Sequence, residues 1–247
     1  MSSDSNGIEV AYSTTHKAML VDYPVPDIDR DRGFSELFPL ARPYTMTGKE
    51  ALYALYRSVE YVCRRGVPGD FVECGVWKGG SALLAGLAMR AFGADRRLHL
   101  YDTFEGMTAP TDVDVDLEGH FARDYIEQYG DDGKWCYAGV EDVKAAFTAH
   151  GFTEPQVRYV VGDVMQTLRT DLPDAISVLR LDTDWYESTR FELETLYPRL
   201  SPGGVLIIDD YGHWEGARKA VDEFFAAEPA ILLNRVTYAV RVGVKLS

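Results

Sequence analysis

The sequence predicts an α/β fold, a doubly wound and mostly parallel sheet of seven strands, and two observations favour it. Short, continuously apolar runs such as 178–181 and 205–208 are typical of strands buried on both faces of a parallel sheet. Segments with apolar residues at helical spacing separate these runs, and such alternation of strand and helix is typical of a doubly wound sheet. With 247 residues, the chain is long enough to bury a large core in one domain.

Residues 1–45 are expected to form an N-terminal arm rather than part of the core of the domain at 46–247. Prolines should interrupt any long element there. The segment 34–44 is nevertheless too apolar for a disordered tail and must pack on something. The core, the substrate and a second subunit are the three alternatives, so the arm could serve as a lid or as the contact of a homo-oligomer. The prolines are Pro24, Pro26, Pro39 and Pro43.

The first half of the domain begins with a helix. Thr47 and Glu50 have the T-x-x-E spacing of a capping box, which predicts that the helix starts there. Further along, residues 104–150 begin with an acid-rich segment and are expected to form an insertion on the substrate side of the active site. The strands expected in this half are 71–75, 98–100 and 157–161.

The second half alternates strand and helix and ends in two strands. One helix is expected from near Ser188 and another over 214–227, because apolar residues recur there at helical spacing. The last two strands are expected to form an antiparallel hairpin that turns at Asn234-Arg235. The strands expected in this half are 178–181, 205–208, 231–233 and 236–246.

Acidic side chains follow two of the predicted strands, at the point where each strand ends. Asp182 and Asp184 are two positions apart, so they point the same way while the chain is extended. Asp209 and Asp210 can converge only if the backbone turns after them. Ligands of such sheets bind beyond the carboxyl ends of the strands, where four carboxylates would repel one another without a cation. Although a single acid there more often caps a helix, two clusters predict a hard divalent ion such as Mg²⁺.

A glycine-rich turn after the strand at 71–75 is the second signal, with the spacing E-x-G-x-x-x-G from Glu73. Glycines let a ligand approach the backbone closely, although a tight turn alone also needs them. Asp102 follows after about twenty residues, where a carboxylate can bind ribose hydroxyls. Because the spacing differs from the G-x-G-x-x-G of pyrophosphate-binding loops, the expected cofactor is S-adenosylmethionine. Glu73 would then lie near its ammonium group and Asp163 near its adenine.

The composition argues against several classes of partner. A formal net charge of −14 provides no basic face for nucleic acid or for an anionic membrane. The sequence shows no apolar run long enough to span a bilayer and no signal-peptide pattern. The three cysteines lack metal-ligand spacing, which favours reduced thiols and a cytoplasmic protein. The expected partners are a small-molecule substrate and a second copy of the chain.

Four motifs together resemble the macrocin O-methyltransferase family of actinobacterial enzymes, which methylate sugar hydroxyls of antibiotics. The resemblance covers residues 45–230. It implies a class I methyltransferase fold, S-adenosylmethionine and Mg²⁺. The acceptor would be a deoxysugar hydroxyl, either on a natural-product glycoside or on a sugar nucleotide similar to dTDP-rhamnose. The motifs are FVECGVWKGGSA, LYDTFEGM, LRLDTDWYEST and SPGGVLIIDDYG, in that order.

The resemblance also assigns roles to single residues. Asp182, Asp209 and Asp210 would bind the metal, and Asp184 would be the catalytic base. His213, which follows the second acid pair, is the alternative base because its unperturbed pKa suits the task. The cofactor contacts would be Met46, Thr47, Glu73, Gly75, Ser81, Asp102, Thr103, Asp163 and Asp182.

Three other functions compete with sugar methylation. A metal-dependent catechol or phenol O-methyltransferase would share the fold, the cofactor and the metal, but it would need a flat apolar slot for its acceptor. A nicotinamide-dependent oxidoreductase is disfavoured by the glycine spacing. A catalytically inactive binding protein is disfavoured because an acid cluster without a function is costly to keep.

Overall fold

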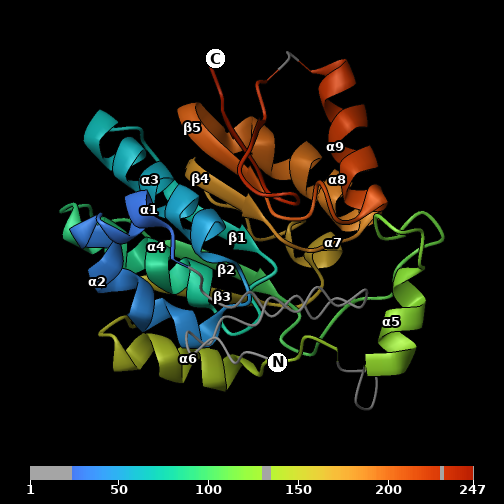
Figure 1. Ribbon diagram of the computed structural model, residues 1–247, viewed down its shortest axis with the longest axis horizontal. Helices are drawn as coiled ribbons and strands as arrows, with labels where there is room; N and C mark the ends of the chain where they lie inside the picture. The colour runs from blue at the N-terminus through green and yellow to red at the C-terminus, as the bar shows by residue number, and fades with distance from the viewer. Residues whose placement is uncertain (1–23, 130–134, 229–230, 247) are drawn as a thin grey trace, which may run out of the picture.

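The computed structural model describes residues 24–129, 135–228 and 231–246. A seven-stranded sheet with the strand order β3-β2-β1-β4-β5-β7-β6 runs through the molecule (Figure 1). β1 to β5 pair in parallel, and β7 pairs antiparallel to both β5 and β6. The doubly wound, mostly parallel sheet is therefore confirmed. The strands are β1 Asp70–Cys74, β2 Leu98–Asp102, β3 Val157–Val161, β4 Ile176–Leu181, β5 Leu200–Ile208, β6 Asn234–Arg235 and β7 Arg241–Val244.

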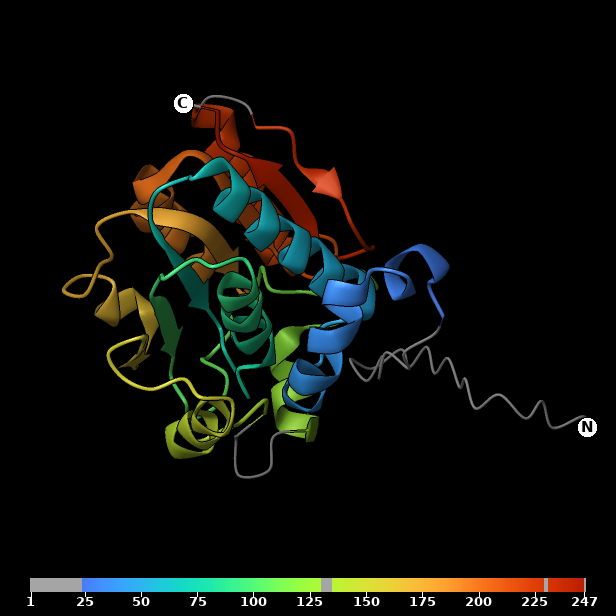
Figure 2. The same cartoon turned by 90° about the vertical axis from the view of Figure 1, so that its left-hand side faces the viewer.

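Helices cover both faces of the sheet (Figures 1 and 2). α2, α3 and α4 pack together on one face, and α8 packs with α7 and α9 on the other. None of the described helices is long and apolar enough to cross a membrane. The helices are α1 Pro26–Asp29, α2 Arg32–Ala41, α3 Lys49–Arg65, α4 Gly80–Ala91, α5 Ala122–Tyr129, α6 Val140–Ala149, α7 Val164–Thr167, α8 Tyr186–Leu196 and α9 Glu215–Ala227.

The core consists of two main apolar clusters, because the central strands are apolar on both faces. Phe71 and Val178 lie in the cluster that includes the buried residues of α3 and α4. Their neighbours in sequence, Val72 and Leu179, point the other way and lie in the cluster with α8 and α9. Burial on both faces explains why these strands read as continuous apolar runs.

Residues 24–45 pack on this core, which corrects the expectation of an arm separate from it. The fully buried ring of Phe34 lies 5.1 Å from that of Tyr53 in α3, between ring centroids. Pro39 does not interrupt its helix, since α2 continues through it, whereas Pro26 stands at the start of α1 and Pro43 follows the end of α2. Of the three alternatives for the arm, the described part contacts the core; residues 1–23 lie outside the described residues.

The predicted capping box is wrong. α3 begins at Lys49 after Gly48, whose backbone is extended, and no side chain caps the helix. The hydroxyl of Thr47 instead accepts a hydrogen bond of 3.0 Å from Arg180. A long-range bond of this kind cannot be read from local spacing.

The final hairpin turns later than predicted. Arg235 already pairs with Arg241, so the turn spans 236–240 and does not lie at Asn234-Arg235. Thr237 stabilises it, because its hydroxyl accepts hydrogen bonds from the backbone N–H groups of Ala239 and Val240. The antiparallel pairing itself is as predicted.

Candidate active site

The carboxyl ends of β1, β4 and β5 meet where the winding of the sheet changes direction, the usual ligand site of such folds. Two backbone hydrogen bonds extend the strand ladders into the acidic turns. The N–H of Asp182 donates to the carbonyl of Cys74 at 2.8 Å, and that of Asp209 donates to Leu181 at 2.9 Å. The acids after β4 and β5 are therefore placed by the sheet itself and lie next to the end of β1.

Asp182, Asp184 and Asp210 form a group that could hold a cation. One carboxylate oxygen of each lies within 4.8 Å of the others. Asp184 adopts a left-handed backbone with φ of 67°, which is uncommon outside glycine. Burial raises the pKa of Asp184 to about 7, and it raises the pKa of Asp182 and Asp210 well above the usual range. Half-buried carboxylates in this arrangement suit a hard divalent ion.

An unsatisfied carboxylate oxygen provides a separate test of whether this group of acids suits a cation. Oδ2 of Asp210 is buried and makes no hydrogen bond to any residue that the structure describes. A buried acceptor without a donor is costly, and a cation would compensate it. The acid group therefore fits the predicted metal.

Asp209 lies outside this group of three. Its Oδ1 accepts a hydrogen bond of 2.6 Å from Arg180, a residue of β4 that is only 2% exposed. Sequence reasoning missed Arg180. The available signal was a charged residue inside an apolar strand, because a buried arginine needs anionic partners.

The glycine turn after β1 lies against the acidic turn after β4. Gly75 has a φ of 81°, and a Cβ at this position would overlap the carbonyl oxygen of Asp182, so the turn requires glycine. Glu73 is completely buried, and burial raises its pKa to about 7. Its Oε2 has no hydrogen-bond partner among the described residues, which suits a cationic group of a ligand.

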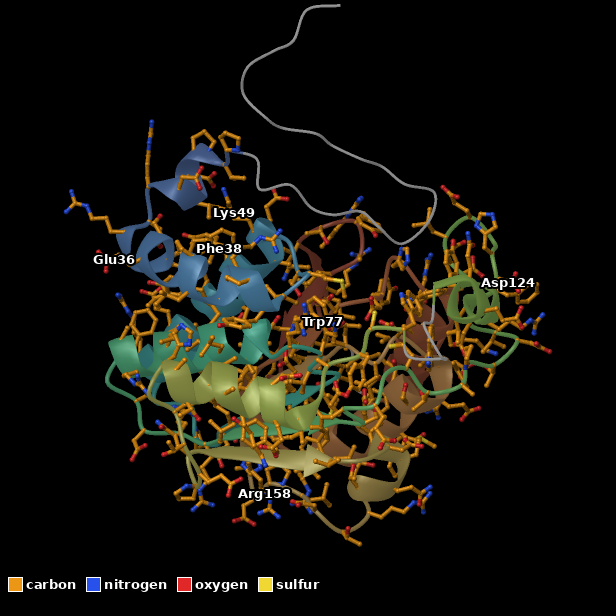
Figure 3. The ribbon with its side chains drawn as sticks, turned by 90° about the horizontal axis from the view of Figure 1, so that it is seen from below. Glu36, Phe38, Lys49, Trp77, Asp124 and Arg158 are labelled. Atoms are coloured by element: carbon orange, nitrogen blue, oxygen red, sulfur yellow. The ribbon has the colours of Figure 1, made fainter. Side chains whose placement is uncertain are left out.

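Asp102 ends β2, as predicted, but its carboxylate also shapes the glycine turn. Oδ2 accepts hydrogen bonds from the N–H groups of Val76 at 2.6 Å and Trp77 at 3.0 Å. Oδ1 accepts one from Phe104 at 2.7 Å. The Thr103 hydroxyl also lies 3.4 Å from Oδ1, but its single proton is shared with the nearer carbonyl of Gly106 at 2.6 Å. A carboxylate has about four lone-pair positions, so one position is left for a ribose hydroxyl only where Thr103 bonds Gly106. Figure 3 shows Trp77 of this turn near the middle of the molecule.

The remaining predicted cofactor residues have varied surroundings. Asp163 caps α7 by accepting from the N–H of Met165 at 2.8 Å. The hydroxyl of Thr103 donates to the carbonyl of Gly106 at 2.6 Å. Ser81, at the start of α4, is buried, with its hydroxyl 3.4 Å from that of Thr47. Met46 is 53% exposed.

His213, the alternative base, lies beside Tyr238. Its Nδ1 is 3.2 Å from the Tyr238 hydroxyl, and its ring meets Trp214 edge-on. Burial lowers the pKa of His213, so the imidazole is neutral at neutral pH. Burial, and then the nearby Asp210 and Asp209, raise the pKa of Tyr238 to about 12, which places this phenol near the acids.

Residues 104–129 and 135–138 form a cap that is anchored next to the acids. The indole N–H of Trp185, the residue after Asp184, donates to the carbonyl of Thr108 at 3.0 Å. The ring of Trp185 also packs edge-on against Trp214, with centroids 5.0 Å apart. α5 belongs to this cap and stands apart from the other helices in Figure 1.

Two further contacts define the extent of the cap. The fully buried Asp114 accepts from the N–H of Tyr186, the first residue of α8, at 2.8 Å. The pKa of Cys136 is raised to about 12, mainly by burial and next by Asp184, so the end of the cap also lies near the acids. α6 does not belong to the cap, because its Phe147 packs against Gly79 of the glycine turn. The predicted insertion at 104–150 thus contains two distinct parts.

This sheet, with the strand order β3-β2-β1-β4-β5-β7-β6 and an antiparallel β7, is that of the class I S-adenosylmethionine-dependent methyltransferases. The solved O-methyltransferase NovP is similar, with a TM-score of 0.72 and 33% identity over 83% of each chain. The model of the macrocin O-methyltransferase (TylF) family matches residues 5–232. The chain belongs to this family and is an O-methyltransferase, which confirms the resemblance seen in the sequence.

Two curated relatives show the family's range. The chain is 40% identical to the 8-demethyl-8-(2,3-dimethoxy-alpha-L-rhamnosyl)-tetracenomycin-C 4'-O-methyltransferase of Streptomyces olivaceus, over 73% of this chain and 67% of that protein. It is 35% identical to the mycinamicin III 3''-O-methyltransferase of Micromonospora griseorubida, over 85% of this chain and 80% of that protein.

Proposed function

We propose that this protein transfers a methyl group from S-adenosylmethionine to a hydroxyl of a deoxysugar in antibiotic biosynthesis, with the help of Mg²⁺. The observation that carries the proposal is the group of Asp182, Asp184 and Asp210 beside the glycine turn. The acceptor class is supported by the relatives, whose names describe methylation of a rhamnosyl tetracenomycin and of mycinamicin III. These names favour a glycoside over a sugar nucleotide as the acceptor.

In the proposed mechanism, Asp182, Asp209 and Asp210 hold the metal. When bound, the metal makes the acceptor hydroxyl easier to deprotonate. Asp184 receives that proton, because it is buried in the same group of carboxylates and its left-handed backbone brings it there.

The other residues position the cofactor and exclude water. The turn at Gly75 lets the methionine end of the cofactor approach the backbone, and Asp102 binds its ribose. The cap around Trp185 shields the reacting atoms from water. Holding the acceptor oxygen in line behind the methyl carbon lowers the barrier to methyl transfer.

A methyl-transfer assay with matched panels of deoxysugar glycosides and phenols tests the function. We expect turnover of glycosides, loss of turnover with a chelator and recovery with Mg²⁺. Turnover of phenols alone would establish the catechol-type alternative.

A pair of variants tests the roles of the carboxylates. Asp184→Asn should lose most of kcat and keep metal binding, whereas Asp209→Asn should lose metal affinity, as measured by titration with Mn²⁺. The reverse pattern would make Asp184 the third ligand, as the group of three carboxylates in the structure would allow.

A further inference from the structure

Arg180 lies among the acids, and the mechanism proposed above gives it no role. Nη1 donates to Oε1 of Glu73 at 2.8 Å and to Oδ2 of Asp182 at 2.6 Å. Nη2 donates to Oδ1 of Asp209 at 2.6 Å and to the hydroxyl of Thr47 at 3.0 Å. One buried guanidinium therefore joins β1, the turns after β4 and β5, and the loop before α3.

We propose that Arg180 is a positioning residue that fixes Asp182 and Asp209 in the orientation in which they bind the divalent cation. The inference rests on the proposed function, which places that cation at these acids. Asp182 gives Oδ2 to Arg180 and Asp209 gives Oδ1, so one oxygen of each aspartate is left to bind the cation. Arg180 would thereby restrict each aspartate to that one remaining oxygen.

Geometry explains why an arginine stands here. The guanidinium is planar and carries its donors in a fixed fork, so it can hold carboxylates on two sides at once. A lysine would keep the charge, but its single ammonium group on a flexible stem could not span Glu73, Asp182 and Asp209 in this way. Residues that hydrogen-bond to metal ligands fix the orientation of those ligands, and replacing such residues usually lowers the affinity for the metal.

The balance of charge around Arg180 is compatible with an additional divalent cation. One guanidinium pairs with Glu73, Asp182 and Asp209. Asp184 and Asp210 each have a carboxylate oxygen within 4.8 Å of one of Asp182. A single positive charge cannot neutralise these five carboxyl groups once they ionise. Because burying such a cluster is costly, Arg180 is better explained by orientation of the ligands than by a gain in stability.

The test compares Arg180→Lys with the wild-type protein by titration with Mn²⁺ alone, followed by electron paramagnetic resonance in the absence of cofactor. We expect Mn²⁺ to bind 10- to 100-fold more weakly (about the effect of losing a partner that orients a metal ligand), with the fold confirmed by circular dichroism. Arg199→Lys is the matched control, because Arg199 bonds the carbonyl of Pro173 at the opposite end of β5. It should bind Mn²⁺ like the wild type.

The possible outcomes separate this inference from the proposed function. A folded Arg180→Lys variant with wild-type affinity for Mn²⁺ would show that Arg180 is merely structural and would overturn the inference alone. A wild-type protein that binds no Mn²⁺ would overturn the metal site and the inference together. If Arg180→Lys does not fold, Thr47→Val decides, because it removes one contact of the guanidinium and keeps every charge. Several-fold weaker binding supports the inference, and unchanged binding overturns it.

Discussion

Glu192 of α8 is expected to make the stability of this protein depend on pH. Its carboxylate is fully buried, and both oxygens lie within hydrogen-bond distance of the Thr183 hydroxyl, at 3.0 and 3.1 Å. Burial is the main reason that its pKa is raised from 4.5 to about 8, and Asp163 contributes in the same direction. Glu192 is therefore mostly protonated in the folded protein at neutral pH, whereas it is ionised in the unfolded chain.

The sign and size of the effect follow from this difference. A carboxyl whose pKa is raised on folding contributes its full stabilisation below pH 4.5 and loses it as the pH rises to about 8. Within that window, each pH unit lowers the free energy of unfolding by ~1.4 kcal/mol. Between pH 5 and pH 7, ionisation of Glu192 should therefore lower the free energy of unfolding by about 2–3 kcal/mol. Glu192→Gln should not show this loss, because the amide stays neutral and can still bond Thr183.

The assay is urea unfolding of both proteins at pH 5, 6, 7 and 8, followed by circular dichroism without added metal. The stability of Glu192→Gln relative to the wild type should rise by about 2–3 kcal/mol from pH 5 to pH 7. Glu73 and Asp184, whose pKa values are also raised, affect both proteins equally and cancel in the difference. Parallel pH profiles for the two proteins would refute the reasoning.

Three other changes test the fold and the cofactor site. Gly75→Ala should lower the melting temperature and abolish S-adenosylmethionine binding, because its Cβ would overlap the carbonyl of Asp182; an intact melting curve would contradict this. Asp102→Asn should weaken cofactor binding by about ten- to a hundredfold, because one charge-assisted hydrogen bond is lost. Calorimetry measures this affinity, and an unchanged Kd would exclude the ribose contact. Phe34→Ala should lower the free energy of unfolding by about 3–5 kcal/mol in urea, whereas a small change would mean that α2 does not support the core.

The sheet and its acidic edge could be predicted because both depend on patterns along the chain. Continuous apolar runs predict strands buried on both faces, and the topology then brings the acids after two strands together. Because residues two positions apart in an extended chain point the same way, the sequence predicts only that the side chains of Asp182 and Asp184 lie on the same side of the backbone. The grouping of Asp184 with Asp210 also depends on the left-handed backbone of Asp184, which the pattern does not contain.

Partners that are distant in sequence could not be predicted. Arg180 meets Glu73 and Thr47 across more than 100 positions, and no local spacing encodes these bonds. Glu192 occupies a helical position that reads as a polar residue between apolar ones, although the fold buries it completely. In both cases the sequence contains the residue, and only the packing of several elements shows its role.

The aromatic anchor of the cap has a practical consequence. All four tryptophans of the chain belong to the segments around this site: Trp77 to the glycine turn, and Trp135, Trp185 and Trp214 to the cap and its anchor. The intrinsic fluorescence of the protein therefore originates next to the ligands and not in a distant part of the fold. It offers a label-free optical signal for occupancy, and Trp77→Phe would separate the emission of the glycine turn from that of the cap and its anchor.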